Sequence, residues 1–170
     1  MLCDEMGKSQ IDFSLIGGVA LYFSGSPRTT FDVDFLTVFS ESDRIDELMR
    51  RLGYRALHRS EDAANYAGSD ADLGHVDFLF ARRKYSLKML RRADKMEVLG
   101  RSVKVLKPED LIGLKVQSSS NDPQRAAKDR ADIEDLMRRN AKSLDWELIG
   151  EYFKLFNRET ELQELRRKIS

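Results

Sequence analysis

Alternation of apolar and polar side chains, clearest around Asp32 and Asp34, predicts a β-strand over residues 31–39. Because successive side chains of a strand point to opposite faces, the alternate apolar residues share one face: Phe31, Val33, Phe35 and Phe39. Asp32 and Asp34 fall on the other face, with α-carbons roughly 6.5–7 Å apart from the rise per residue. One face of this strand therefore suits a core, and the other presents two carboxylates.

The residues before this strand predict a strand, a glycine turn and a helix in succession. Residues 11–16 are short and largely apolar, and Gly17-Gly18 follows them. Residues 19–23 are apolar enough to form a buried helix. The acidic strand is thus reached through a tight glycine turn.

The residues after the acidic strand predict a helix, a strand and a loop. Ser40 and Asp43 form a Ser-x-x-Asp capping pattern. The apolar residues behind it recur at helical spacing: Ile45, Leu48, Met49 and Leu52. Residues 54–58 predict another strand, whereas residues 59–72 are polar and rich in small side chains, which indicates mainly a mobile loop or an irregular edge.

A strand is next predicted over residues 73–81, followed by a hairpin. The two arms of the hairpin are residues 96–99 and 103–106, and the polar residues 100–102 form its turn. Together with the earlier strands, these elements predict a mixed sheet.

Helical patterns take over from Pro108 onward. Pro108 suits the first turn of a helix, and Asp122-Pro123 combines an N-cap with a proline start. Two further apolar stripes predict packed helices: Trp146, Ile149, Phe153 and Phe156, then Leu162, Leu165 and Ile169. We therefore expect an α+β fold, with a mixed β-sheet flanked by helices over residues 1–107 and a C-terminal helical bundle over residues 108–170 packed on that core.

Composition and charge narrow the class of protein. With 170 residues, 41% hydrophobic and 34% charged, the chain suits one compact soluble unit. The 29 basic residues equal the 29 acidic ones, so any polyanion must be met by a local patch rather than by net charge. The single cysteine cannot form an intramolecular disulfide, and no apolar run approaches the roughly 20 residues of a membrane span. We expect a cytoplasmic protein without membrane contact or signal peptide.

A third carboxylate completes a candidate metal site. Asp77 stands alone among apolar residues in the predicted strand 73–81. If this strand neighbours the acidic strand at about 4.8 Å, Asp77 lies beside Asp32 and Asp34, and the three acids require a countercharge. Magnesium suits such a site, because it takes hard oxygen ligands and keeps several waters or phosphate oxygens.

These residues resemble the signature of the DNA polymerase beta-type nucleotidyltransferases: Gly17-Gly18, Arg28-x-Thr30-x-Asp32-x-Asp34 and Asp77. The resemblance implies a nucleotidyltransferase fold that binds NTP and two magnesium ions. It implies that the glycine turn, Arg28 and Thr30 contact the nucleotide, that Asp32, Asp34 and Asp77 bind metal, and that Asp77 also helps to activate the acceptor hydroxyl. The turn departs from the family, since many members have Gly-Ser where this chain has Gly-Gly.

The pairing of Gly-Gly with Arg-x-Thr-x-Asp-x-Asp is similar to a narrower branch, the AbiEii-like toxins and minimal nucleotidyltransferases. This likeness spans roughly residues 13–137. It implies an RNA (tRNA) or protein acceptor and a cognate antitoxin as partner.

Basic residues of the helical region have two interpretations. In one, Lys115, Arg125 and Lys128 line the triphosphate while Asp129 and Asp132 orient these cations, similar to the Lys-Asp-x-x-Asp helix of the toxin-like branch. In the other, they form a surface helix with i, i+4 ion pairs. The pattern leaves both open.

Other catalytic classes find little support. His58 and His75 lack a partner at zinc-ligand spacing, and no Gly-x-x-x-x-Gly-Lys-Ser/Thr loop is present. Three hypotheses therefore remain: transfer of NMP from NTP to a hydroxyl of RNA or protein, transfer to a small molecule of the antibiotic type, and an inactive nucleotidyltransferase-like binding module.

Overall fold

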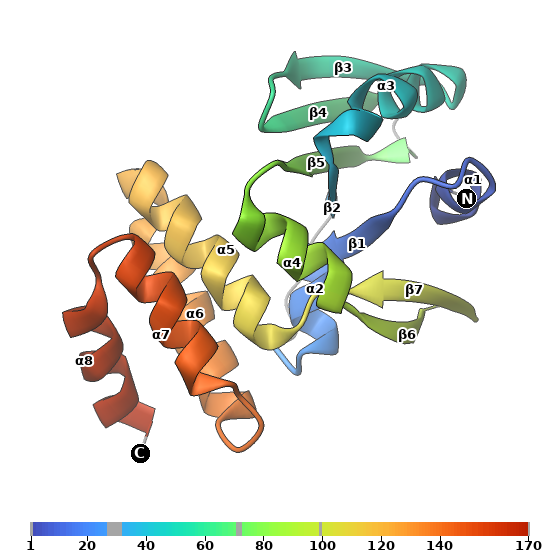
Figure 1. Cartoon of the computed structure of the whole chain (residues 1–170). Helices are drawn as coiled ribbons and strands as arrows, with labels where there is room; N and C mark the ends of the chain where they lie inside the picture. The colour runs from blue at the N-terminus through green and yellow to red at the C-terminus, as the bar shows by residue number, and fades with distance from the viewer. Residues whose placement is uncertain (1, 27–31, 71–72, 99, 170) are drawn as a thin grey trace. The chain divides into compact units, whose positions relative to one another are not determined.

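Seven strands form one mixed sheet in the computed structural model, which describes residues 2–26, 32–70, 73–98 and 100–169 (Figure 1). The expected α+β architecture with a mixed sheet and helices is confirmed. The chain forms two compact units, and the division between them falls within helix α2 (Gly17–Phe23). The first unit is Met1–Ala20 with Thr29–Leu106, and the second is Leu21–Arg28 with Lys107–Ser170.

The sheet belongs to the first unit and has the order β3-β4-β5-β2-β1-β7-β6. Its strands are β1 (Phe13–Ile16), β2 (Asp32–Val38), β3 (Tyr54–Arg59), β4 (Ala63–Gly68), β5 (His75–Ala81), β6 (Asp94–Val98) and β7 (Arg101–Val105). β2 runs parallel to β5 and antiparallel to β1, which in turn runs parallel to β7. β6 and β7 form the predicted hairpin.

An aromatic row packs one face of the central strands. Phe35 of β2 and Phe78 of β5 are paired in register and stack with ring centroids 5.3 Å apart. Phe13 meets the edge of Phe35 at 5.5 Å, and Tyr66 of β4 meets Phe78 at 5.9 Å. Phe35, Phe78 and Tyr66 are almost completely buried. Of the apolar face predicted over residues 31–39, Phe35 belongs to this row. Phe31 lies outside the described residues, and Phe39 lies beyond the end of β2.

The loop predicted over residues 59–72 is wrong in its central part. Ala63–Gly68 forms strand β4, which pairs antiparallel with both β3 and β5. Ala64 and Tyr66 are buried, whereas Asn65 between them is only partly so. Alanine and glycine have little intrinsic preference for strands, and here neighbouring strands and the Tyr66 ring supply the stability.

The first unit contains the predicted helix α3 (Ser42–Arg51). It also contains two helices that the hydrophobic pattern did not reveal, α1 (Leu2–Lys8) and α4 (Lys84–Arg92). The capping pattern predicted at Ser40 is wrong, because Ser40 lies in the short 3-10 helix η1 (Phe39–Glu41) and α3 has no side-chain hydrogen bond at its N-cap. Burial of Ile45 and Met49 instead accounts for α3.

The second unit is helical. It contains α5 (Pro108–Asn121), η3 (Pro123–Arg125), α6 (Ala126–Asn140), α7 (Trp146–Leu155) and α8 (Glu159–Ile169). Pro108 occupies the first turn of α5, and the Asp122 carboxylate accepts from the Gln124 amide, as the sequence predicts. Close packing of α5 on α7 requires Gly113, because a Cβ there would lie 2.8 Å from the Tyr152 ring.

Candidate functional site

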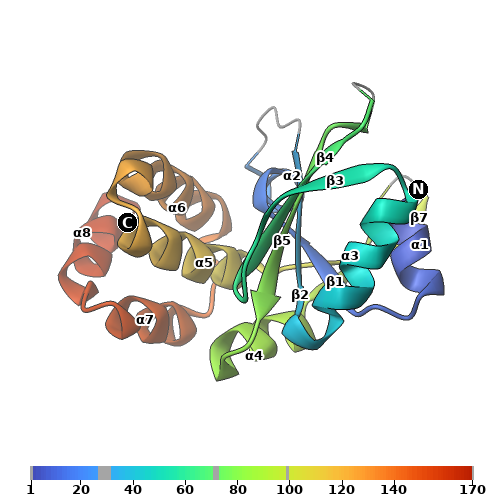
Figure 2. The same ribbon diagram turned by 90° about the horizontal axis from the view of Figure 1, so that it is seen from above.

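Three carboxylates lie on one face of two neighbouring strands. β2 and β5 run side by side (Figure 2), and their register pairs Asp34 with Asp77 and Asp32 with His75. Residues paired across parallel strands project to the same face, so these acids share the face opposite the aromatic row. The structure thus brings the predicted acidic residues onto adjacent positions of one surface.

Asp34 also packs against the glycine turn. Ile16, the last residue of β1, pairs with Asp34, and Gly17 follows with a φ of +59°. A Cβ on Gly17 would lie 1.9 Å from Asp34 Oδ2, so only glycine leaves room for the carboxylate. The turn predicted at Gly17-Gly18 therefore stands directly beside the acidic strand.

Asn65 adds a side chain that the sequence analysis missed. Its Nδ2 donates to Asp77 Oδ1 at 2.8 Å, and the two residues are paired across β4 and β5. On the same strand as Asp77, His75 is paired with Asp32, and its Nδ1 lies 4.0 Å from Asp32 Oδ1. The only sequence signal for Asn65 was the alternation of Ala64 and Tyr66 around it, which small residues on both sides obscured.

Carboxylate oxygens are suitable ligands for magnesium, although the three aspartate side chains do not meet at one point in this structure. Within the described parts of the chain, no three His, Cys, Asp or Glu side chains already surround one point. Asp32, Asp34 and Asp77 nevertheless supply carboxylate oxygens from adjacent positions, and magnesium takes its remaining ligands from water and phosphate. These three residues would hold the metal. Arg28 and Thr30, the other predicted contacts of this region, lie outside the described residues.

Lys115 of α5 is buried between two carboxylates of α6. Its Nζ lies 3.0 Å from Asp129 Oδ1 and 2.6 Å from Asp132 Oδ2, and its side chain is only 13% exposed. Burial is the largest influence on Asp129 and acts to raise its pKa. Hydrogen bonding by Ser118 and Lys115 and the charges of Lys115 and Arg125 outweigh burial, so the pKa of Asp129 lies below its ordinary value. Lys115 is therefore already engaged in a buried ion-pair network.

The other two predicted cations differ from Lys115. Arg125 Nε lies 3.5 Å from Asp129 Oδ2, which is the i, i+4 pair of the surface-helix interpretation. Lys128 is exposed and has no ion pair within the part of the chain that the structure describes. Neither arrangement by itself identifies a phosphate contact.

A tether joins the segment after α2 to α6 within the second unit. The Ser26 hydroxyl donates to Asp135, and Asn140 Nδ2 donates to the Ser24 carbonyl at 3.1 Å. Burial acts to raise the pKa of Asp135, but the Ser26 hydrogen bond and Arg139 hold it below its ordinary value. These contacts anchor Ser24 and Ser26 to α6.

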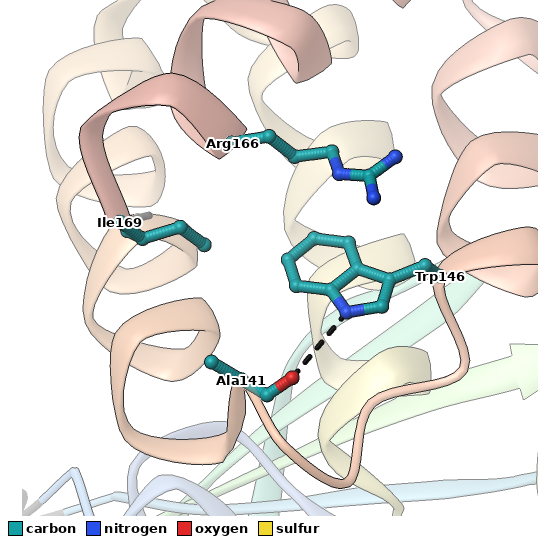
Figure 3. Close-up of a pocket in the computed structure, with 4 residues that line it drawn as sticks. All are labelled: Ala141, Trp146, Arg166 and Ile169. Atoms are coloured by element: carbon teal, nitrogen blue, oxygen red, sulfur yellow. Dashed lines mark hydrogen bonds between the residues drawn. The ribbon is translucent and has the colours of Figure 1, made fainter.

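A small cavity in the helical unit holds none of the predicted site residues. It measures about 220 Å³ and is lined by Ala141, Trp146, Arg166 and Ile169 (Figure 3). The Arg166 guanidinium lies 4.8 Å from the centre of the Trp146 ring, and Trp146 Nε1 donates to the Ala141 carbonyl at 3.4 Å. These contacts connect the ends of α6, α7 and α8.

We predict that Gly17→Ala destabilises the first unit more than Gly100→Ala does. Both glycines have positive φ, +59° and +73°, but a Cβ on Gly100 meets nothing within 4 Å. Gly100→Ala therefore costs about 1–2 kcal/mol of the free energy of unfolding, and Gly17→Ala costs about 1–3 kcal/mol more because Asp34 must move. Denaturant unfolding measures both, and equal losses would contradict the packing of Asp34 on the turn.

The Lys115 network predicts a specific acid sensitivity. Because the folded-state pKa of Asp129 is lowered from 3.8, its charge stabilises the fold above that pH, and this contribution is lost as pH falls through the folded pKa. Asp129→Asn removes the contribution, so its unfolding free energy varies less steeply with acidic pH than that of the wild type. The measurement is denaturant unfolding of both proteins at a series of pH values from pH 5 downward. If the unfolding free energy of the two proteins depends on pH equally, the Lys115 network is not the source of the acid sensitivity.

No described helix combines the length and apolar character needed to cross a membrane.

Solved structures similar to this chain share its fold over most of their length. The antibiotic-resistance factor ANT(2'')-Ia has a TM-score of 0.65 at 13% identity, covering 99% of this chain and 94% of that one. The lincosamide antibiotic adenylyltransferase LnuA has a TM-score of 0.57 at 11% identity, covering 79% and 91%. An antigenic nucleotidyltransferase-like protein from Paracoccidioides brasiliensis has a TM-score of 0.58 at 18% identity, covering 96% and 88%.

Sequence comparison supplies the family. No curated protein matches the chain significantly. A family model described as uncharacterised nucleotidyltransferase, however, matches residues 2–167, almost the whole chain. The carboxylates of β2 and β5 and the glycine turn beside them thus lie in a chain that belongs to this family and is a nucleotidyltransferase.

Proposed function

We propose that this protein transfers a nucleoside monophosphate from a magnesium-bound NTP to a hydroxyl group of an acceptor. The observation that carries the proposal is the register of β2 and β5, which pairs Asp34 with Asp77 while Gly17 leaves room for the Asp34 carboxylate. Asp32, two residues away on the same strand, adds the third carboxylate. This is the minimal donor set for magnesium and a triphosphate.

The proposed reaction is an in-line displacement at the α-phosphorus of the NTP. The acceptor oxygen forms a bond to that phosphorus, the bond to the bridging oxygen of the β-phosphate breaks, and pyrophosphate leaves. Asp77 accepts the hydroxyl proton, directly or through water. Asp32, Asp34 and Asp77 would hold magnesium, which would supply neutralisation of the charge that develops during the displacement.

Nucleotide contacts beyond the carboxylates form a second part of the proposal. The backbone of Gly17-Gly18 admits close approach of a phosphate, and Arg28 and Thr30 follow as further contacts by resemblance to the family. Of the cations of the helical unit, the exposed Arg125 and Lys128 are the better phosphate ligands, since Lys115 is already neutralised by Asp129 and Asp132.

The acceptor is proposed from the similar structures and from the motif. One of these structures is named as an antibiotic-resistance factor and covers 99% of this chain, and another is named as a lincosamide antibiotic adenylyltransferase. That likeness supports a small hydroxyl-bearing acceptor. The Gly-Gly and Arg-x-Thr-x-Asp-x-Asp motif supports the other candidate, an AbiEii-like toxin that modifies RNA or protein and is neutralised by a cognate antitoxin.

A labelling experiment tests the reaction and sorts the acceptors. Purified protein is incubated with each α-³²P-labelled NTP and magnesium, together with total tRNA, a protein extract or a panel of aminoglycoside and lincosamide antibiotics. We expect the wild type to transfer label and Asp34→Asn to transfer it at least about 100-fold more slowly. The reason is that loss of the Asp34 carboxylate weakens metal binding, and with it a stabilisation of the transition-state charge that is worth several kcal/mol.

The matched control is Asp43→Asn. It removes an exposed acid of α3 that is not a proposed ligand, and we expect it to keep wild-type transfer. Transfer that persists in Asp34→Asn, or that continues with chelator in place of magnesium, would contradict the proposal. The fraction that carries label identifies the acceptor class.

A further inference from the structure

The Asp77 carboxylate has a fixed neighbour that the family signature does not include. Asn65 and Asp77 are paired directly across β4 and β5, and Asn65 Nδ2 donates to Asp77 Oδ1 at 2.8 Å. A carboxylate only accepts hydrogen bonds, so the amide must present its NH₂ group to Asp77. The contact therefore has a defined direction.

The surroundings of Asn65 point to a role in the site rather than in the core. The side chains that stabilise β4 are Ala64 and Tyr66, which are buried on the opposite face. Asn65 shares its own face with Ala63 and Ala67 along β4, and its partners on the neighbouring strands are His58 of β3 and Asp77 of β5. Asparagine is among the poorer strand formers. Its place in the middle of this strand is explained by the bond to Asp77.

The hydrogen bond from Asn65 also offsets an electrostatic repulsion. Asp34 and Asp77 are paired in register, and two facing carboxylates repel each other. A donor on the β4 side offsets this repulsion and restrains the Asp77 side chain on the side away from Asp34. With Oδ1 engaged by Asn65, Oδ2 is the oxygen left to meet a metal ion or the acceptor hydroxyl.

We propose that Asn65 is a positioning residue that orients Asp77 for activation of the acceptor hydroxyl. This inference rests on the function proposed above. Asn65 does not itself touch the reacting atoms, and it acts through the orientation of one carboxylate. Residues that hold a ligating carboxylate in this way typically contribute about 10- to 100-fold to activity.

The test compares two variants of Asn65 with a control on the same strand. Asn65→Leu keeps the size of the side chain and removes the donor, whereas Asn65→Thr keeps a donor in a residue that favours strands. Ala63→Ser changes a half-buried residue on the same face that is paired with Leu79 instead of an acid. The readouts are kcat, KM for NTP, the stoichiometry of magnesium-dependent NTP binding and Tm.

We expect Asn65→Leu to lower kcat about 10- to 100-fold while KM for NTP and the binding stoichiometry stay at their wild-type values. Asn65→Thr recovers part of the lost kcat, and Ala63→Ser keeps all of it. Unchanged stoichiometry excludes the trivial explanation that fewer molecules are folded.

The inference is overturned if Asn65→Leu keeps wild-type kcat, if it loses NTP-binding sites in proportion to kcat, or if Asn65→Thr is as impaired as Asn65→Leu. Failure of the underlying function gives a different result. In that case the wild type itself transfers no label, whatever residue occupies position 65, and the positioning role falls with it.

Discussion

The stacking of Phe35 on Phe78 is the contact on which the geometry of the acidic site depends. The two rings lie on the core face of β2 and β5, extended by Phe13 and Tyr66 into a row across four strands. Because side chains alternate between faces, a slip of one residue would expose these rings and turn the carboxylates inward. The free energy of burying the aromatic row therefore also holds Asp34 opposite Asp77. Stability and chemistry are set by opposite faces of the same strands.

The acidic face is costly without a countercharge, and the structure offsets that cost locally. Asn65 donates to Asp77, and the Gly17 turn gives Asp34 room beside the end of β1. Both features allow the two carboxylates to stay close together despite their mutual repulsion. Magnesium keeps several of its waters and is usually held by one or two carboxylates together with phosphate oxygens, so acids at adjacent positions of one face suit such an ion.

How far the sequence predicts this protein depends on the strength of each local pattern. The alternation around Asp32 and Asp34 and the apolar residues around Asp77 were enough to predict two strands that carry acids. That the two strands are neighbours was a condition of the site, and it is the structure that pairs them. Strand β4 was missed because Ala63, Ala67 and Gly68 carry almost no strand signal, and its stability comes from partners distant in sequence. Asn65 was missed with it, since its meaning lies entirely in a contact across strands.

The helical unit shows a different limit of sequence interpretation. The spacing of Lys115, Asp129 and Asp132 was compatible with a phosphate-binding wall or with surface ion pairs. In the structure Asp129 and Asp132 of α6 both hold Lys115 of α5, as the first interpretation expected, although this pairing between residues fourteen and seventeen positions apart does not show whether Lys115 contacts a phosphate. Helical periodicity predicts which residues share one helix face, but it does not predict which residues of another helix they meet.

The most direct measurement is the position of a metal ion in crystals grown with Mn²⁺ and a non-hydrolysable NTP analogue. Mn²⁺ takes the same oxygen ligands as magnesium and is located by its anomalous scattering. We predict a peak within ligand distance of Asp32, Asp34 and Asp77, with the triphosphate reaching the Gly17-Gly18 turn. A bound nucleotide whose metal contacts none of these three carboxylates would contradict the assignment of this face as the active site.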